Sequence, residues 1–162
     1  MALDGFHAFT VEHKGRVKKL LSRAKLVSGD QSIDVTALWD TGATCTAIST
    51  EVVKRLGLPV RGKDTIKTPS GSKQVQTYLV DIGLPNNVII HNVDVCDSDI
   101  GEQNIDLLIG MNIISLGDFA VSNYEGKTNF SFRIPSQRAV DYRAAAVWGN
   151  NMVKSHNKRK AK

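Results

Sequence analysis

The sequence predicts a mainly β domain, and three observations support this. Short apolar or alternating segments recur along the chain, turn residues separate them, and few segments carry a helical pattern. At 162 residues, with 41% hydrophobic and 23% charged residues, the chain fits one domain with or without a tail.

Strands account for most of the expected elements, because β-branched and aromatic residues alternate in them with polar ones. Residues 16–27 fit a helical spacing as well as a strand from 20 to 27, and the β-rich neighbours favour the strand. Hairpins are expected at residues 64–82 and 118–134, and single strands or pairs at residues 6–11, 33–39, 88–96 and 105–110.

A short helix is expected at residues 50–56. Ser49 is a good N-cap, because its hydroxyl can accept a bond from a free amide of the first turn. Glu51 lies in that turn, where the helix dipole favours an acid, and Gly57 suits the left-handed position after the helix. A helical turn is also expected at residues 111–116.

The C-terminal part carries an uneven charge. Five of the 21 lysine and arginine residues lie in the last dozen positions, and the other 16 balance the 16 acids. The body is therefore formally neutral, which argues against a nucleic-acid-binding face and leaves only weak attachment through the tail. We expect a domain at residues 1–135, a helix at 136–149 with Ser136 as N-cap and Gly149 after it, and a basic, disordered tail at 150–162.

Composition limits the location and the cofactors. No apolar run approaches the roughly 20 residues needed to span a bilayer, and the N-terminus lacks a signal pattern, so we expect a cytoplasmic protein without membrane contact. Cys45 and Cys96 make no disulfide framework and no zinc-ligand spacing, and they are expected to be small buried side chains. No metal or cofactor is expected.

Asp40 ends an apolar strand and is followed by Thr41 and Gly42. Burying a carboxylate costs several kcal/mol or raises its pKa unless something compensates. Such an acid either anchors a turn, in which glycine supplies a positive φ, or is a reactive acid. The reactive interpretation requires a helix soon after, a glycine-tipped hairpin and a later apolar strand ending in glycine, and the sequence predicts all of them in that order.

The segment Leu38-Trp39-Asp40-Thr41-Gly42-Ala43-Thr44, with Ile48-Ser49 after it, resembles the active-site loop of retropepsin-like aspartic proteases. Leu108-Ile109-Gly110-Met111-Asn112 resembles the second apolar-glycine element of that family, and residues 117–135 resemble the C-terminal part of its bacterial single-domain members. The resemblance extends over residues 6–135. It implies a single-lobe acid protease fold with short helices.

The resemblance implies an endopeptidase that activates a water molecule between two carboxylates sharing one proton. The chain contains one Asp-Thr-Gly, and Asp106 lies before Leu107 rather than on such a turn. The expected solution is a homodimer in which each chain supplies Asp40. The expected partner is a peptide or protein substrate, bound as an added strand.

Further roles follow from the same resemblance. Thr41 would hydrogen-bond across the dimer, Gly42 would contribute to substrate binding, and Ala43 would leave room beside the two acids. Ile109 and Gly110 would pack beneath the loop. The residues implied for the flap, the hairpin that closes over substrate, are Thr68, Pro69, Ser70, Gly71 and Ser72.

Two other functions compete with the protease. A catalytically silent module with the same fold could bind peptides or mediate assembly, since a single chain carries half of a site. A nucleic-acid-associated protein could act through residues 150–162, and its binding would depend strongly on salt.

Overall fold

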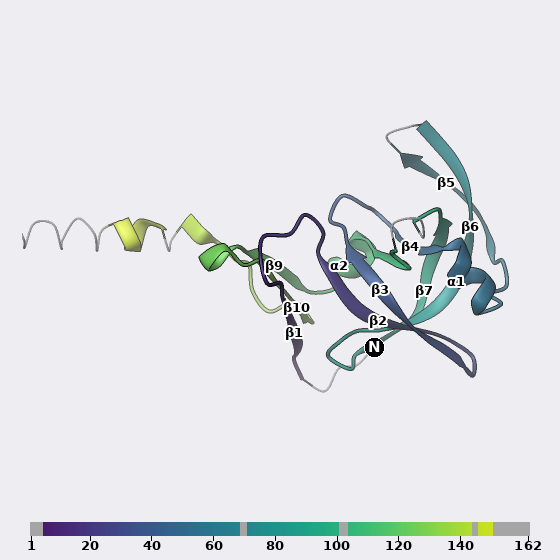
Figure 1. Cartoon of the computed structure of the whole chain (residues 1–162), viewed down its shortest axis with the longest axis horizontal. Coiled ribbons are helices and arrows are strands. Elements are labelled where there is room, and N and C mark those ends of the chain that lie inside the picture. The colour runs from purple at the N-terminus through teal and green to yellow at the C-terminus, as the bar shows by residue number, and fades with distance from the viewer. Residues whose placement is uncertain (1–4, 69–70, 101–103, 144–145, 151–162) are drawn as a thin grey trace, which may run out of the picture.

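The computed structural model describes residues 5–68, 71–100, 104–143 and 146–150, and confirms the mainly β fold. A larger sheet has the strand order β2-β3-β8-β4-β7-β6-β5, and a smaller one has the order β1-β10-β9 (Figure 1). The larger sheet consists of β2 (Leu21–Ser28), β3 (Gln31–Trp39), β4 (Thr46–Ser49), β5 (Gly62–Thr68), β6 (Gly71–Gly83), β7 (Ile89–Ser98) and β8 (Leu107–Ile109). The remaining elements are β1 (His7–Glu12), α1 (Thr50–Arg55), α2 (Met111–Ile114), β9 (Asp118–Ser122), a 3-10 turn (Tyr124–Gly126) and β10 (Asn129–Ile134).

The larger sheet closes on itself, because β2 pairs with β6 as well as with β3. Its interior holds the main hydrophobic core, which includes Leu26, Ile48 and Ile82. Within the closed sheet β3 runs parallel to β8, with Trp39 opposite Ile109. The ends of these two strands therefore place Asp40 beside Gly110. In the described part of the chain, no helix is long and apolar enough to cross a membrane.

An aromatic cluster joins the two sheets. The ring of Trp39 lies 5.0 Å from that of Phe132, 5.5 Å from that of Phe119 and 5.8 Å from that of Phe130, measured between centroids. Phe9 of β1 lies 5.7 Å from Trp39. The other rings come from Phe119 of β9 and from Phe130 and Phe132 of β10, so the smaller sheet packs against β3, the strand that ends just before Asp40.

The prediction of a strand within residues 16–27 is confirmed by β2, and that of the helix after Ser49 by α1. The Ser49 hydroxyl accepts a bond from Val52 N at 3.2 Å, and Gly57 has a φ of 57°. The sequence did not indicate β4, whose four residues are all buried. Because both faces of β4 are covered, its sequence lacks the alternation that marks a half-exposed strand.

Strand β6, the second strand of the 64–82 hairpin, buries one face near Val75 and the opposite face from Tyr78 onward. Val75 faces a small cluster with Ala47 and Cys96, whereas Tyr78 and Val80 belong to the main core. The strict alternation expected along this strand therefore breaks between residues 75 and 78. The outer half of the hairpin extends away from the closed sheet (Figure 1).

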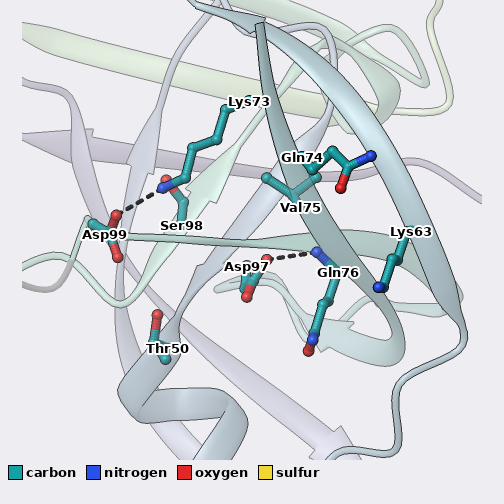
Figure 2. Close-up of a pocket in the computed structure, with 9 residues that line it drawn as sticks. All are labelled: Thr50, Lys63, Lys73, Gln74, Val75, Gln76, Asp97, Ser98 and Asp99. Atoms are coloured by element: carbon teal, nitrogen blue, oxygen red, sulfur yellow. Dashed lines mark hydrogen bonds and ion pairs between the residues drawn. The ribbon is translucent and has the colours of Figure 1, made fainter.

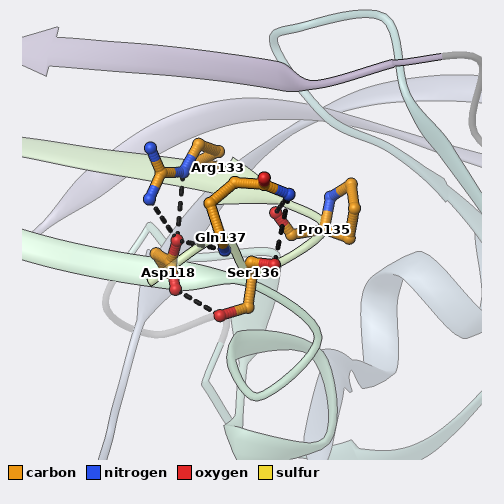
Figure 3. A network of polar contacts seen from close by, with 5 residues as sticks. All are labelled: Asp118, Arg133, Pro135, Ser136 and Gln137. Atoms are coloured by element: carbon orange, nitrogen blue, oxygen red, sulfur yellow. Dashed lines mark hydrogen bonds and ion pairs between the residues drawn. The ribbon is translucent and has the colours of Figure 1, made fainter. Parts of the chain in front are cut away.

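The helix expected to start after Ser136 begins later. Residues 136–141 are not helical, whereas residues 142, 143 and 146–150 are. Ser136 does not cap a helix: its hydroxyl donates to Asp118 instead, as does Gln137 N at 2.8 Å (Figure 3). Arg133 Nε donates to the same carboxylate at 3.0 Å. Of the tail expected at residues 150–162, residue 150 is helical and residues 151–162 lie outside the described residues.

The hydrogen bonds to Asp118 make the stability of the fold depend on pH. Hydrogen bonds from Ser136, Gln137 N and Arg133 hold the pKa of Asp118 well below its ordinary value of 3.8. A lowered folded-state pKa adds stability that is present above the ordinary value and is lost as the pH falls below it. The melting temperature of Asp118→Asn should thus lie below that of the wild type near neutral pH, and the gap should narrow below about pH 4.

Thermal melts from neutral pH down to about pH 2 measure this gap. The matched control is Asp141→Asn, which removes the partner of Arg143 from an ion pair whose side chains are 47% and 91% exposed. Exposed pairs contribute little, so this variant should melt close to the wild type. A gap for Asp118→Asn that stays constant with pH would contradict the assignment.

Truncating the aromatic cluster should be costly. Phe130 is fully buried, so Phe130→Ala removes a buried ring and leaves a cavity. We expect it to lower the free energy of unfolding by about 3–5 kcal/mol. Urea denaturation measures this, with Phe6→Ala as control, because Phe6 is 69% exposed and its truncation should change stability by about 0.5 kcal/mol or less. Equal effects of the two variants would mean that the cluster does not join the sheets.

Candidate active site

Asp40 begins a loop, residues 40–45, that we call the Asp40 loop. Its side chain is half-buried rather than buried, and Thr41 and Gly42 are exposed. Asp40 N donates to Ile109 O at 3.0 Å, and Gly42 N donates to Asp40 Oδ1 at 2.8 Å. The carboxylate is therefore oriented by the main chain of its own loop, while its other oxygen can accept a further bond.

Gly42 leaves room beside the Asp40 carboxylate. It does not have the positive φ that a glycine serving only the turn would supply. It is absent from the glycines with positive φ, and a Cβ built on it would lie 3.2 Å from Asp40 Oδ1. A side chain here would press on the carboxylate. The small residue thus keeps open the approach to Asp40.

The structure brings Ile109 and Gly110 against the underside of the Asp40 loop. A Cβ on Gly110 would lie 2.4 Å from Cys45 O, a distance that no side chain can occupy. Met111 N donates to Ala43 O at 2.8 Å, and Asn112 N donates to Thr44 O at 3.2 Å. The start of α2 therefore holds the loop through main-chain bonds.

Thr46 completes this support and was not predicted. It is fully buried, donates its hydroxyl to Asn112 Oδ1 at 2.7 Å, and accepts a bond from Gly110 N at 3.2 Å. Asn112 belongs to the second apolar-glycine motif, but Thr46 lies 66 positions away from it in the sequence. Only the pairing of β4 with β8 brings the two together.

A cleft of about 750 Å³ lies between the Asp40 loop and β5. This volume is within the usual range for sites that enclose a ligand. Its floor combines small and apolar side chains with the Asp40 carboxylate. The lining residues are Asp40, Gly42, Ala43, Thr44, Cys45, Ala47, Asp64, Thr65, Ile66, Lys67, Cys96, Ser98 and Leu108.

The residues expected at the hairpin tip are placed only in part. Thr68 ends β5, and Gly71, with a φ of 118°, and Ser72 begin β6, whereas Pro69 and Ser70 lie outside the described residues. The cleft is lined on this side by residues 64–67 of β5 instead.

The other lining residues that the sequence did not indicate include Cys45, Ala47 and Cys96. Val75 lies beneath them in the same small cluster, although it does not line the cleft. Such residues are ordinary core types, and their role follows from the pairing of β4 with β7 and β8.

A second cavity, of about 320 Å³, is bordered by β6 and the end of β7 (Figure 2). Two polar contacts cross it: Lys73 Nζ lies 2.7 Å from Asp99 Oδ2, and Gln76 N donates to Asp97 Oδ1 at 2.8 Å. Ser98 lines both this cavity and the cleft. No residue of the Asp40 loop lines this cavity, and the two contacts across it link β6 to the end of β7.

Asp106 is an internal hydrogen-bond partner. Its Oδ2 accepts a bond from Thr36 N at 3.0 Å, and its own N–H donates to Thr36 O at 3.0 Å. Among the residues that the structure describes, no group of three His, Cys, Asp or Glu side chains could hold a metal ion.

Known proteins resemble this chain in sequence and in fold. A family model described as aspartyl protease matches residues 25–113, more than half of the chain. A retropepsin-like aspartic protease from Rickettsia conorii superposes with a TM-score of 0.54 at 14% identity, covering 83% of this chain and 99% of that one. This likeness shows the fold.

Two further solved structures are more distant. The protease of EIAV, in complex with an inhibitor, has a TM-score of 0.47 at 21% identity over 60% of this chain and 86% of that one. The retroviral protease-like domain of Ddi1 from Leishmania major has a TM-score of 0.41 at 18% identity over 65% and 82%. No curated protein matches the sequence. With the family model covering both the Asp40 loop and Gly110, the chain belongs to the aspartyl protease family and has a retropepsin-like fold.

Proposed function

We propose that the protein is an aspartic endopeptidase whose two catalytic carboxylates are the Asp40 side chains of a homodimer. The observation that carries this proposal is the placement of Asp40 at the floor of the cleft, oriented by Gly42 N. Membership of the aspartyl protease family supports the reaction type.

The dimer is proposed because one chain offers half of the machinery. Thr41 and Gly42 are exposed at the edge of the cleft, so a second copy could approach them. A twofold axis beside this loop would bring two Asp40 side chains together and let Thr41 bond to its counterpart. Asp64 also lines the cleft, but it is exposed on β5 and is not followed by Thr-Gly.

In this arrangement two adjacent carboxylates share one proton and titrate as a pair. The ionised Asp40 takes a proton from a water molecule held between them, and that water attacks the scissile carbonyl carbon. The protonated Asp40 of the partner donates to the carbonyl oxygen, giving a tetrahedral diol without a covalent enzyme intermediate. Proton transfer to the amide nitrogen then breaks the peptide bond.

The hairpin of β5 and β6 would act as the flap. Residues 64–67 of β5 line the cleft, so an extended peptide lying there would run beside an existing strand. β6 pairs with β7 only from Thr77 onward, so in the described part of the chain the outer half of the hairpin has no third strand beside it, and its Lys73–Asp99 pair is 52% and 75% exposed. Such exposed pairs contribute little stability, so the hairpin can move while the floor stays fixed.

Replacing Asp40 tests the reaction. Asp40→Asn keeps the acceptor for Gly42 N but cannot share a proton, so kcat/KM for peptide cleavage should fall at least about 10²–10⁴-fold. The control is Asp106→Asn, a half-buried aspartate whose acceptor for Thr36 N the asparagine oxygen keeps. It should retain activity. Undiminished cleavage by Asp40→Asn, with its fold verified by circular dichroism, would refute the proposal.

Mixing the two forms tests the shared site. Wild-type chains are combined with a ninefold excess of Asp40→Asn chains and allowed to exchange subunits. If each site needs an Asp40 from both chains, cleavage per wild-type chain should fall about tenfold, because mixed dimers are inactive. A fall of this size also argues against the silent peptide-binding module, which would cleave nothing at any ratio. Unchanged cleavage per wild-type chain would mean that one chain carries a complete site.

A further inference from the structure

Cys45 and Cys96 meet at the floor of the cleft. Their Sγ atoms lie 3.7 Å apart, both side chains are free thiols, and both line the cleft that holds Asp40. Cys45 is the last residue of the Asp40 loop, immediately before β4, and Cys96 lies in β7 opposite Ala47. The parallel pairing of β4 with β7 thus unites two thiols that are 51 positions apart.

The two thiols have different surroundings. Cys96 is 5% exposed and packs with Ala47 and Val75, whereas Cys45 is half-buried. Burial, together with the neighbouring Cys45 thiol, raises the pKa of Cys96 to about 12. Since the thiolate is the reactive form, Cys96 is a poor first nucleophile. Cys45 is the more accessible sulfur, and a small reagent that enters the cleft meets it first.

We propose that Cys45 and Cys96 form a reversible oxidation site, in which a hydroperoxide converts the pair into an intrachain disulfide that disturbs the cleft beside Asp40. The formation of this disulfide does not depend on whether the protein cleaves peptides. Its effect on peptide cleavage rests on the proposed protease function.

The reaction balances with a hydroperoxide as the oxidant. The Cys45 thiolate attacks the peroxide oxygen, the O–O bond breaks, and a sulfenic acid forms with release of water from hydrogen peroxide. The Cys96 sulfur then attacks the Cys45 sulfur, its proton leaves with the hydroxide as a second water, and the S–S bond forms. The two thiols lose two electrons and two protons, and a dithiol reductant reverses the change.

The disulfide must alter the floor of the cleft. An S–S bond is about 2.05 Å long, so the sulfur atoms approach each other by about 1.7 Å from their present separation of 3.7 Å. Cys45 cannot follow freely, because its carbonyl oxygen packs against Gly110 and the preceding carbonyls of Ala43 and Thr44 are bonded to α2. Part of the displacement is therefore transmitted to the Asp40 loop. A shift of about 1 Å in such a site can lower a rate by up to about a hundredfold.

The test oxidises the full-length wild type and Asp40→Asn with hydrogen peroxide and then reduces half of each sample with dithiothreitol. We expect the intact mass of both proteins to fall by two hydrogen atoms, and proteolytic peptides containing Cys45 and Cys96 to be linked within one chain. In the wild type, kcat/KM should fall about tenfold or more on oxidation and recover on reduction.

The variants Cys45→Ser and Cys96→Ala separate the disulfide from other damage. The kcat/KM of each variant is compared before and after mild oxidation. Neither variant can form the disulfide, so neither should lose the activity that the wild type loses and recovers on reduction. Two free thiols after oxidation, a link between chains, or an equal and reversible loss in Cys96→Ala would overturn the proposal. Absence of cleavage by the reduced wild type would refute the protease function, while mass and peptide mapping would still decide whether the disulfide forms.

Discussion

The packing of Trp39 between the two sheets is the constraint on which the rest of the structure depends. Its side chain is 4% exposed, and its indole N–H donates to Ser22 Oγ at 2.9 Å. Its main-chain N–H donates to Leu20 O at 2.9 Å. The ring is enclosed by phenylalanines of the smaller sheet, so neither sheet can move without it. Because Asp40 follows directly, the aromatic cluster around Trp39 helps to set the position of the acid.

Close main-chain approaches distinguish the floor of the cleft from the hairpin beside it. Gly110 lies against Cys45 O, and a Cβ on Gly117 would lie 2.1 Å from Arg133 O, so both approaches exist only because these residues lack side chains. The described residues in the outer half of the β5–β6 hairpin show no glycine approach as close as these, and an exposed ion pair between Lys73 and Asp99 links this half to the end of β7.

The elements that the sequence predicted are those specified by local patterns. Ser49 caps the start of α1 by accepting a hydrogen bond from Val52 N, and Gly57 follows its end with a positive φ. Both features are local, so the sequence alone predicted them. Ser136 carries the same local signal, but Asp118 competes for its hydroxyl from 18 positions away, so no helix starts there. The four buried residues of β4 show no alternation at all. Tertiary contacts decide such cases, and single-residue preferences cannot reveal them.

The same reasoning explains why the motif was visible but the cleft was not. Asp40, Thr41 and Gly42 are consecutive, whereas the residues beside them in space come from β5, β7 and β8. The buried strand β4 connects these parts: it pairs with β7 on one side and β8 on the other, and Thr46 links it to Gly110. Any change in the spacing of β4 and β7 therefore reaches the Asp40 loop through Cys45 and Gly110. An acid held by its own loop and a thiol pair at the loop's end are thus mechanically coupled, although no direct contact between them is required.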